Sequence, residues 1–65
     1  MNWELAKQAL KEEKEVFVKE FPNYIIFLTE YGNVYRYKKN KPKKLIQPNT
    51  FNINDFFRND WEIIK

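Results

Sequence analysis

The chain has 65 residues and a formal net charge of +3, and 43% of its residues are hydrophobic and 18% aromatic. This length leaves room for one small domain over residues 1–65, and the apolar share is too high for a disordered tail. Because a domain of this size buries only about 60% of the surface of its unfolded chain, its core is small. Association with further copies would add stability, so we expect a single domain that forms homo-oligomers.

The chain lacks His, Cys and Ser, and it has a single glycine, Gly32. The usual general base near neutral pH, thiol nucleophiles and the Cys/His ligands of metal sites are therefore missing. A single glycine also excludes both of the glycine-rich loops that bind phosphate groups. The composition predicts a protein that is not an enzyme and that holds no metal or cofactor.

The longest apolar run, residues 24–28, is far shorter than the roughly 20 residues that span a bilayer. The N-terminal residues include Glu4, Lys7 and Lys11, where a signal peptide needs an apolar stretch. We therefore expect a protein of the cytoplasm with no membrane contact.

Residues 2–12 have the apolar spacing of an amphipathic helix. At about 100° per residue, the apolar side chains fall within an arc of about 160°. These side chains are Trp3, Leu5, Ala6, Ala9 and Leu10. Asn2 is a suitable N-cap. The helix should end near Glu12 or Glu13, because Glu13 would otherwise point into the apolar arc.

Three stretches have the composition of β-strands. Residues 15–20 alternate in side-chain character, which predicts a strand. Residues 24–30 are β-branched and aromatic with little alternation, which predicts a central strand covered on both faces for part of its length. A tight turn at residues 31–33 leads into a strand at residues 34–38, so these two strands should form a hairpin.

The next segment, residues 39–50, is rich in Lys, Pro and polar residues and is predicted to be a loop. A short extended piece is expected at Leu45-Ile46. Thr50 or Asn52 would then cap a brief helical turn that reaches residue 58.

Residues 60–64 are predicted to form the last strand, with Trp61 and Ile63 facing inward. The predicted architecture is α+β, in which one N-terminal amphipathic helix packs on a mostly antiparallel sheet of three to four strands, with a short helical turn before the last strand. The inward phases of these elements also assign six large rings to the core. They are Trp3, Phe17, Phe21, Phe56, Phe57 and Trp61.

Positive charge gathers in residues 36–44, which contain six cations and no acid, whereas the rest of the chain has six cations and nine acids. Such a cluster attracts the phosphate groups of nucleic acid or of a nucleotide ligand, and nearby tyrosine rings can stack on bases. The candidate ligand-binding residues are Arg36, Lys38, Tyr35, Tyr37, Lys39 and Lys41. The alternative is a solvated lysine-rich loop beside tyrosines that, with Tyr24, pack one face of the sheet.

Three carboxylates, Asp55, Asp60 and Glu62, lie near the C-terminus, and a catalytic pair is one interpretation. We favour a structural role. Asp55 would help to cap the short helix, and Asp60 would bond backbone amides at the turn into the last strand.

Both ends of the chain resemble one family. Residues 1–16, a helical segment followed by a turn into a strand, are similar to the opening of the small Thoeris anti-defence 2-like phage domains, whose turn has the pattern Leu-Lys-x-Gly-Lys-x-Val. Residues 55–63, Asp-Phe-Phe-Arg-Asn-Asp-Trp-Glu-Ile, resemble the closing Asp-Leu-Leu-Ala-x-Asp-Trp-Glu-Val of that family. The chain departs from the pattern where Glu13 replaces the glycine of the turn and Arg58 replaces the alanine of the closing motif.

The resemblance implies a phage protein that acts in the infected bacterial host. Characterised relatives bind signalling nucleotides, such as cyclic ADP-ribose isomers or cyclic oligonucleotides, without cleaving them, and they act as homo-oligomers. The implied function is therefore sequestration of a nucleotide immune signal. Two alternatives stay open: a nucleic-acid-binding module that uses the basic Tyr/Lys segment 31–44, and a direct protein inhibitor of a bacterial defence or CRISPR effector.

Overall fold

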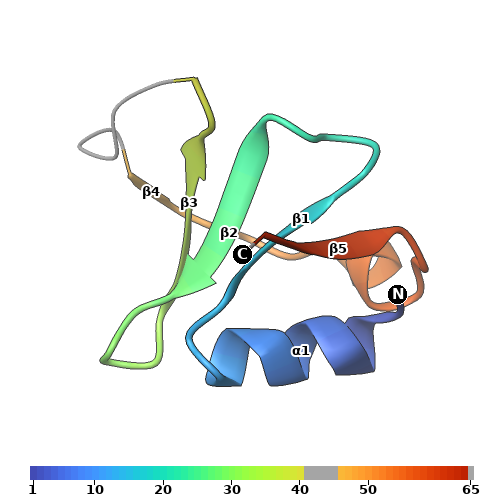
Figure 1. Cartoon of the computed structure of the whole chain (residues 1–65), viewed down its shortest axis with the longest axis horizontal. Helices are drawn as coiled ribbons and strands as arrows, with labels where there is room; N and C mark the ends of the chain where they lie inside the picture. Colours follow the sequence, from blue (N-terminus) through green and yellow to red (C-terminus); the bar gives the residue numbers. More distant parts are fainter. Residues whose placement is uncertain (41–45, 65) are drawn as a thin grey trace.

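The chain forms one helix, an antiparallel sheet and a short 3-10 turn (Figure 1), in a computed structural model that describes residues 1–40 and 46–64. The elements are α1 (Trp3–Lys11), β1 (Glu15–Val18), β2 (Tyr24–Leu28), β3 (Val34–Lys38), β4 (Gln47–Pro48), η2 (Ile53–Phe56) and β5 (Trp61–Ile64). The strand order is β4-β3-β2-β1-β5, and every neighbouring pair is antiparallel. The predicted α+β architecture is confirmed.

The sheet has five strands among the described residues rather than the three to four expected, because the two-residue β4 adds to β3. The extended piece was expected at Leu45-Ile46, but it lies at Gln47–Pro48, and Leu45 is outside the described residues. Pro48 has no N–H to donate, which suits an edge strand with a neighbour on one side only.

Asn2 is the N-cap of α1, as predicted. Its side-chain Oδ1 accepts a hydrogen bond from the backbone N–H of Leu5 at 3.1 Å. This bond satisfies one of the first-turn N–H groups that have no partner within the helix. The observed helix, Trp3–Lys11, lies within the predicted range of residues 2–12.

The helix ends in a left-handed turn at Glu13, whose φ is +64°. The N–H of Lys14 donates to the carbonyl of Ala9 at 3.0 Å, and the N–H of Glu13 donates to the carbonyl of Leu10 at 3.1 Å. This pair of bonds is the Schellman motif, whose left-handed position is usually glycine. A side chain at a positive φ is strained, so the turn forms here at a conformational cost.

The core lies on one face of the sheet, where α1 packs against β1, β2 and β5. Its buried members are Ala6, Ala9, Leu10, Val16, Val18, Ile26 and Trp61. Residues 49–60 join β4 at one edge of the sheet to β5 at the other, and within them the Phe51 ring lies 5.1 Å from the Trp3 ring. This segment therefore crosses the same face as α1, and we call it the covered face.

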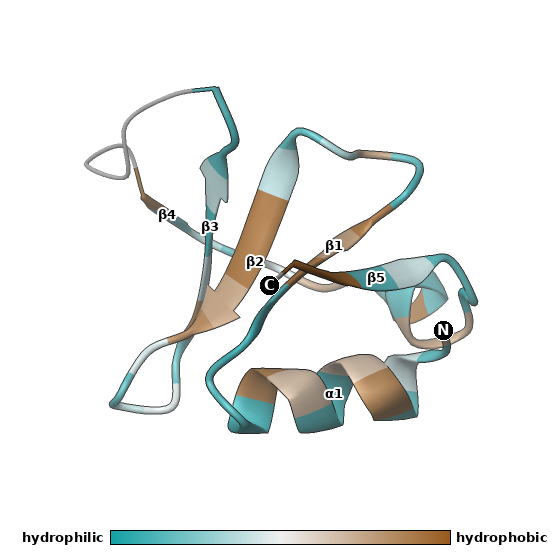
Figure 2. Ribbon diagram, in the orientation of Figure 1, coloured by the Kyte–Doolittle hydropathy of each residue, from teal (hydrophilic) through white to brown (hydrophobic). Residues whose placement is uncertain are grey.

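The opposite face, which we call the open face, has no described helix or strand packed on it. Strand alternation places the side chains of Phe17, Ile25, Phe27, Tyr35 and Tyr37 there. Ile25 is 1% exposed and its neighbour Ile26 is 7% exposed, so β2 is buried on both faces, as its composition predicted. Figure 2 shows the long hydrophobic stretch of this strand.

Several apolar side chains that were predicted to face inward are exposed instead. They are Leu5 (56% exposed), Phe21 (51%), Phe56 (42%), Phe57 (75%) and Ile63 (42%). β1 ends at Val18, so its alternation does not reach Phe21. Phe57 is the C-cap of η2, and Ile63 lies on an edge strand with one neighbour. The prediction is confirmed for Trp61, which is 0% exposed, while Trp3 and Phe17 are half-buried.

Candidate functional site

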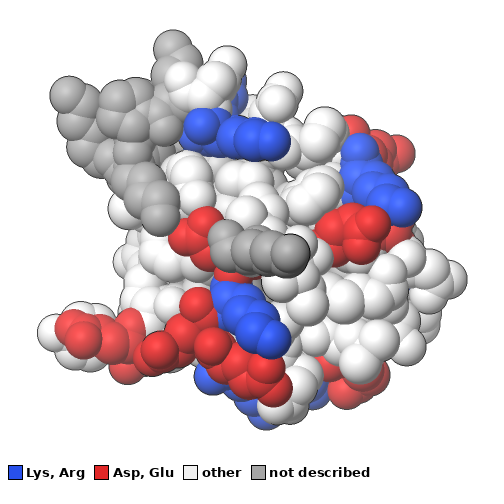
Figure 3. Space-filling view, viewed as in Figure 1, with Lys and Arg blue, Asp and Glu red and all other residues white. Residues whose placement is uncertain are grey.

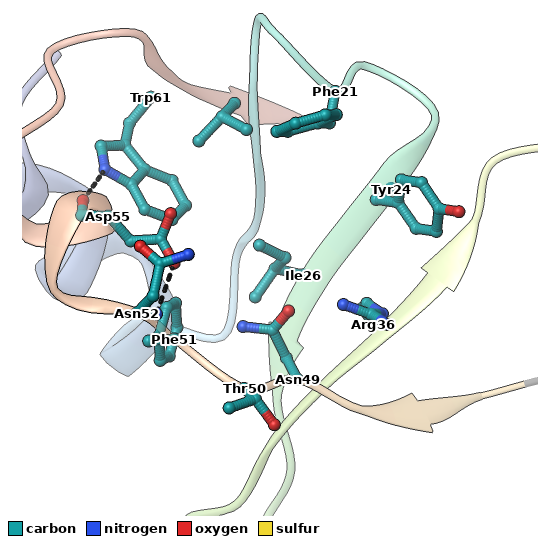
Figure 4. A pocket seen from close by; sticks show the side chains of 11 residues that line it. Phe21, Tyr24, Ile26, Arg36, Asn49, Thr50, Phe51, Asn52, Asp55 and Trp61 are labelled. Carbon is teal, nitrogen blue, oxygen red and sulfur yellow. Dashed lines mark hydrogen bonds between the residues drawn. The ribbon is translucent and has the colours of Figure 1, made fainter.

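A pocket of about 330 Å³ lies on the covered face, between the sheet and the segment 49–55 (Figure 4). It exists because α1 covers only part of this face, and the crossing segment forms a second wall over the remainder. Its volume is at the lower end of the range of roughly 300–1,000 Å³ that is typical of small-molecule sites. One pocket of this size holds a small ligand or one part of a larger ligand.

One side of the pocket is cationic and aromatic. β2 and β3 pair with Ile26 opposite Arg36, which puts Arg36 diagonally beside Tyr24 on the covered face. The Cζ atom of Arg36 lies 5.4 Å from the centre of the Tyr24 ring, and the Nζ atom of Lys38 lies 5.8 Å from it. Both distances suit cation–π interactions, so the Tyr24 ring contacts two cations, of which Arg36 lines the pocket.

The Nε atom of Arg36 is buried and has no hydrogen-bond partner among the described residues. Buried polar atoms in native proteins are nearly always paired, and a buried donor without a partner is costly. A guanidinium group offers its N–H donors in a planar fork that matches phosphate and carboxylate oxygens. Arg36 is therefore the residue in the pocket best suited to bind an anion.

The other side of the pocket carries Asp55, whose side chain is 20% exposed. Its Oδ2 accepts a hydrogen bond from the backbone N–H of Asn52 at 2.9 Å, and its Oδ1 lies 3.6 Å from Nη1 of Arg58. Its backbone carbonyl accepts a hydrogen bond from Nε1 of Trp61 at 3.1 Å. Figure 4 shows Asp55, Asn52 and Trp61 on one side and Arg36 with Tyr24 on the other.

The predicted capping role of Asp55 is confirmed, and the cap residue is Asn52 rather than Thr50. The Asn52 side chain accepts from the N–H of Asn54 at 3.0 Å, while Asp55 bonds the N–H of Asn52 in return. This reciprocal arrangement is a capping box. It fixes the segment that forms the second wall of the pocket. The turn ends at Phe56, two residues before the predicted end at residue 58.

Arg58 connects this wall to residues that lie next to the ends of β1 and β5. Its Nε donates to Oδ1 of Asp60 at 2.6 Å, and its Nη2 donates to Oε1 of Glu20 at 2.8 Å. The hydrogen bond from Arg58 holds the pKa of Asp60 below its ordinary value, and the same bond raises the pKa of Arg58. Asp60 also accepts from the backbone N–H of Glu20 at 3.4 Å, so it bonds a backbone amide that follows β1 rather than one at the turn into β5, where the bond was predicted.

The two predicted tyrosines lie on the open face. The Tyr35 and Tyr37 rings are 6.4 Å and 5.9 Å from the ring of Phe27, and the hydroxyl of Tyr37 donates to Oε1 of Glu15 at 2.7 Å. Because successive side chains of a strand point to opposite faces, Arg36 lies on the other side of the sheet. Within one chain these tyrosines cannot share a ligand with Arg36, and Tyr24 is the tyrosine that lies beside it.

The three predicted lysines do not gather at the pocket. Lys38 shares the covered face with Arg36 but does not line the pocket. Lys39 is exposed at the end of β3, where its backbone N–H donates to the carbonyl of Asn23 at 2.7 Å. Lys41 lies outside the described residues.

The polar residues of the crossing segment are the part of the site that the sequence analysis missed. Asn49, Thr50 and Asn52 line the pocket, although Asn49 was predicted to lie in a loop and Thr50 and Asn52 were considered only as helix caps. The available signal was the density of amide and hydroxyl side chains in residues 47–54, next to an aromatic residue. That composition is typical of polar ligand contacts as well as of turns.

In the view of Figure 3, acidic side chains gather along the lower left of the molecule with Lys and Arg beside them, and separate cationic side chains lie nearer the top. Within residues 1–40 and 46–64, no group of three acidic side chains is placed to hold a metal ion. No described helix has the length and apolar character needed to cross a bilayer.

Comparison of the chain with protein-family models, with curated proteins and with solved structures found no match. The likeness of the two ends to Thoeris anti-defence 2-like domains therefore stays an expectation from the sequence. The pocket is the structural feature that bears on function.

Proposed function

We propose that this protein is a non-enzymatic phage anti-defence protein that binds a nucleotide immune signal in the pocket of the covered face and sequesters it. The observation that carries this proposal is Arg36, a cation in the wall of the pocket whose buried Nε lacks a partner in the described part of the chain. A phosphate oxygen that binds the guanidinium group from the pocket would form a charge-assisted hydrogen bond.

The aromatic side chains of the pocket support a ligand with a flat ring. Tyr24 lies beside Arg36, Phe21 is 51% exposed, and half-buried Phe51 comes from the crossing segment. Such rings offer apolar surface on which a base stacks without sequence-specific contacts. A cation next to flat rings matches the two chemical parts of a nucleotide.

Binding without turnover agrees with the chemistry of the lining. Asp55 is the acidic residue that lines the pocket, and its oxygens already contact the N–H of Asn52 and the guanidinium of Arg58. Sequestration needs only slow release of the ligand, which these groups can provide.

A homo-oligomer is part of the proposal. Beside the pocket, η2 exposes Ile53 (69% exposed) and Phe57 (75%) to solvent. Exposed apolar side chains of this size can form contact surfaces when they are grouped. A second copy over η2 would bury them and would enlarge a pocket of about 330 Å³, which suits a cyclic oligonucleotide better than one subunit does.

The first test is calorimetric titration with cyclic ADP-ribose and a panel of cyclic dinucleotides. Arg36→Gln should weaken binding at least about tenfold, because a hydrogen bond to a charged group contributes about 1.5–3 kcal/mol. Lys11→Gln is the matched control, since it removes the same charge from the exposed side of α1. Equal binding by the wild-type protein and Arg36→Gln would refute the assignment of the anion to Arg36.

Native mass spectrometry then tests sequestration. We expect an oligomer that retains intact ligand in fixed stoichiometry. Release of a cleaved nucleotide would contradict the non-enzymatic proposal.

The two alternatives give different results in the same experiments. A nucleic-acid-binding module would prefer longer oligonucleotides, with an affinity that falls steeply with salt. A direct protein inhibitor would bind none of these ligands and would co-purify with a host defence protein.

A further inference from the structure

We propose that Asp55 makes the pocket selective for nucleobases that carry an exocyclic amino group, over bases that carry a carbonyl oxygen at the same place. This inference rests on the proposed nucleotide-binding function and adds the class of base. Its basis is that the pocket has a cation on one side and a carboxylate on the other (Figure 4).

The Asp55 carboxylate has acceptor capacity left over. An ionised carboxylate has about four lone-pair sites. One is used by the backbone N–H of Asn52 at 2.9 Å, and the contact with Nη1 of Arg58 is longer, at 3.6 Å. The capping box holds the carboxylate in place, so its orientation is set before a ligand arrives. A preorganised acceptor of this kind favours an N–H donor.

The opposite charges also orient the ligand. Arg36 attracts the phosphate, which leaves the base to extend along the pocket toward Asp55. Asn49, drawn between these two sides in Figure 4, can bond either edge of a base because its amide both donates and accepts. Asp55 can only accept, so it is the residue that discriminates.

Adenine and hypoxanthine provide one comparison, and cytosine and uracil provide another. In each pair an amino group is replaced by an oxygen of similar size. The amino group donates a hydrogen bond to the carboxylate, whereas the oxygen is an acceptor that the carboxylate repels. The ring nitrogen beside it also changes, from an acceptor to an N–H donor, so the expected preference applies to a base whose exocyclic group faces Asp55. Because a hydrogen bond to a charged group is strong, we expect AMP and CMP to bind about tenfold or more tightly than IMP and UMP.

The test is titration of the full chain with AMP, IMP, CMP and UMP, followed by backbone and indole N–H chemical shifts, which report even weak binding. Asp55→Asn is the decisive variant. Its side-chain oxygen can still accept from the N–H of Asn52, so the cap is kept, while its amide nitrogen can donate to a carbonyl. The preference for AMP and CMP should disappear or reverse in this variant.

The outcomes separate this inference from the proposed function. If the wild-type protein binds all four nucleotides equally and Arg36→Gln binds none, the pocket is a nucleotide site but the selectivity is refuted. A preference that survives unchanged in Asp55→Asn overturns the role of Asp55. If none of the four binds to the wild-type protein but a ligand of the cyclic nucleotide panel does, the selectivity is refuted and the nucleotide site stands. If neither set binds, both are refuted. The comparison of wild-type affinities needs no variant, so it stands even if Asp55→Asn fails to fold.

Discussion

Replacing Glu13 with glycine should stabilise the protein. Glu13 has a φ of +64° in the Schellman turn that follows α1, and it makes the turn bond to Leu10 through its backbone alone. Its side chain is exposed, so the substitution removes no buried contact. The turn has the geometry that glycine adopts most readily.

The expected gain follows from three contributions. A left-handed conformation costs an L-residue about 1–2 kcal/mol, which Glu13→Gly relieves. Glycine also makes the unfolded chain more flexible, and this opposes the gain by about 0.4–1 kcal/mol. Removing a negative charge from the C-terminal end of α1 adds about 0.3 kcal/mol or more. We expect a net stabilisation of about 1 kcal/mol, or a rise in Tm of about 4–8 °C for a domain of this size.

The assay is thermal and urea denaturation followed by circular dichroism. Glu13→Gln is the matched control, because it removes the charge and keeps the strained side chain. It should gain only the small electrostatic part. A Glu13→Gly variant that is no more stable than Glu13→Gln would refute the left-handed turn, and with it the observed end of α1.

Three further changes test the packing, the cap and the ion pair. Trp61→Ala should lower the free energy of unfolding by about 3–5 kcal/mol, which is close to the whole stability of a small domain. A variant as stable as the wild-type protein in chemical denaturation would contradict the burial of this ring. Asn52→Ala should cost about 1 kcal/mol through the lost cap and should leave the m-value unchanged. The pKa of Asp60 is lowered by its hydrogen bond to Arg58, so its contribution to stability is present above its ordinary pKa of 3.8 and is lost as pH falls through the lower value. Asp60→Asn should therefore flatten the acid limb of a stability profile, and an unchanged profile would contradict the ion pair.

Local rules were enough to predict the hairpin, and strand alternation explains why its side chains divide between two faces, although Arg36, Lys38, Tyr35 and Tyr37 were expected to form one site. Residues 34–38 alternate between basic and aromatic residues, so the sequence alone assigns Arg36 and Tyr35 to opposite faces. The same reasoning found the Asn2 cap and the burial of β2 on both faces. These features depend on residues that are close together in the chain.

The pocket could not be predicted in this way, because it depends on where residues 49–60 cross the sheet. That path follows from the pairing of β5 with β1 at the edge opposite β4, a contact between distant parts of the chain. The sequence did not reveal the route of residues 49–60 across the sheet, so it did not place Arg36 near Asn49 or Asp55. For the same reason it did not distinguish Tyr24 from the other tyrosines of the sheet. The exposed position of Phe57 has the same origin, because η2 and its C-cap Phe57 lie within the crossing segment.

Chemical-shift mapping of the wild-type protein with AMP tests the central claim most directly, because it asks where a nucleotide binds. We predict that the shifts concentrate on Tyr24, Arg36, Asn49 and the indole N–H of Trp61, which surround the pocket on the covered face. Shifts confined to the Tyr35 and Tyr37 side of the sheet, or the absence of any shift at saturating AMP, would contradict the account.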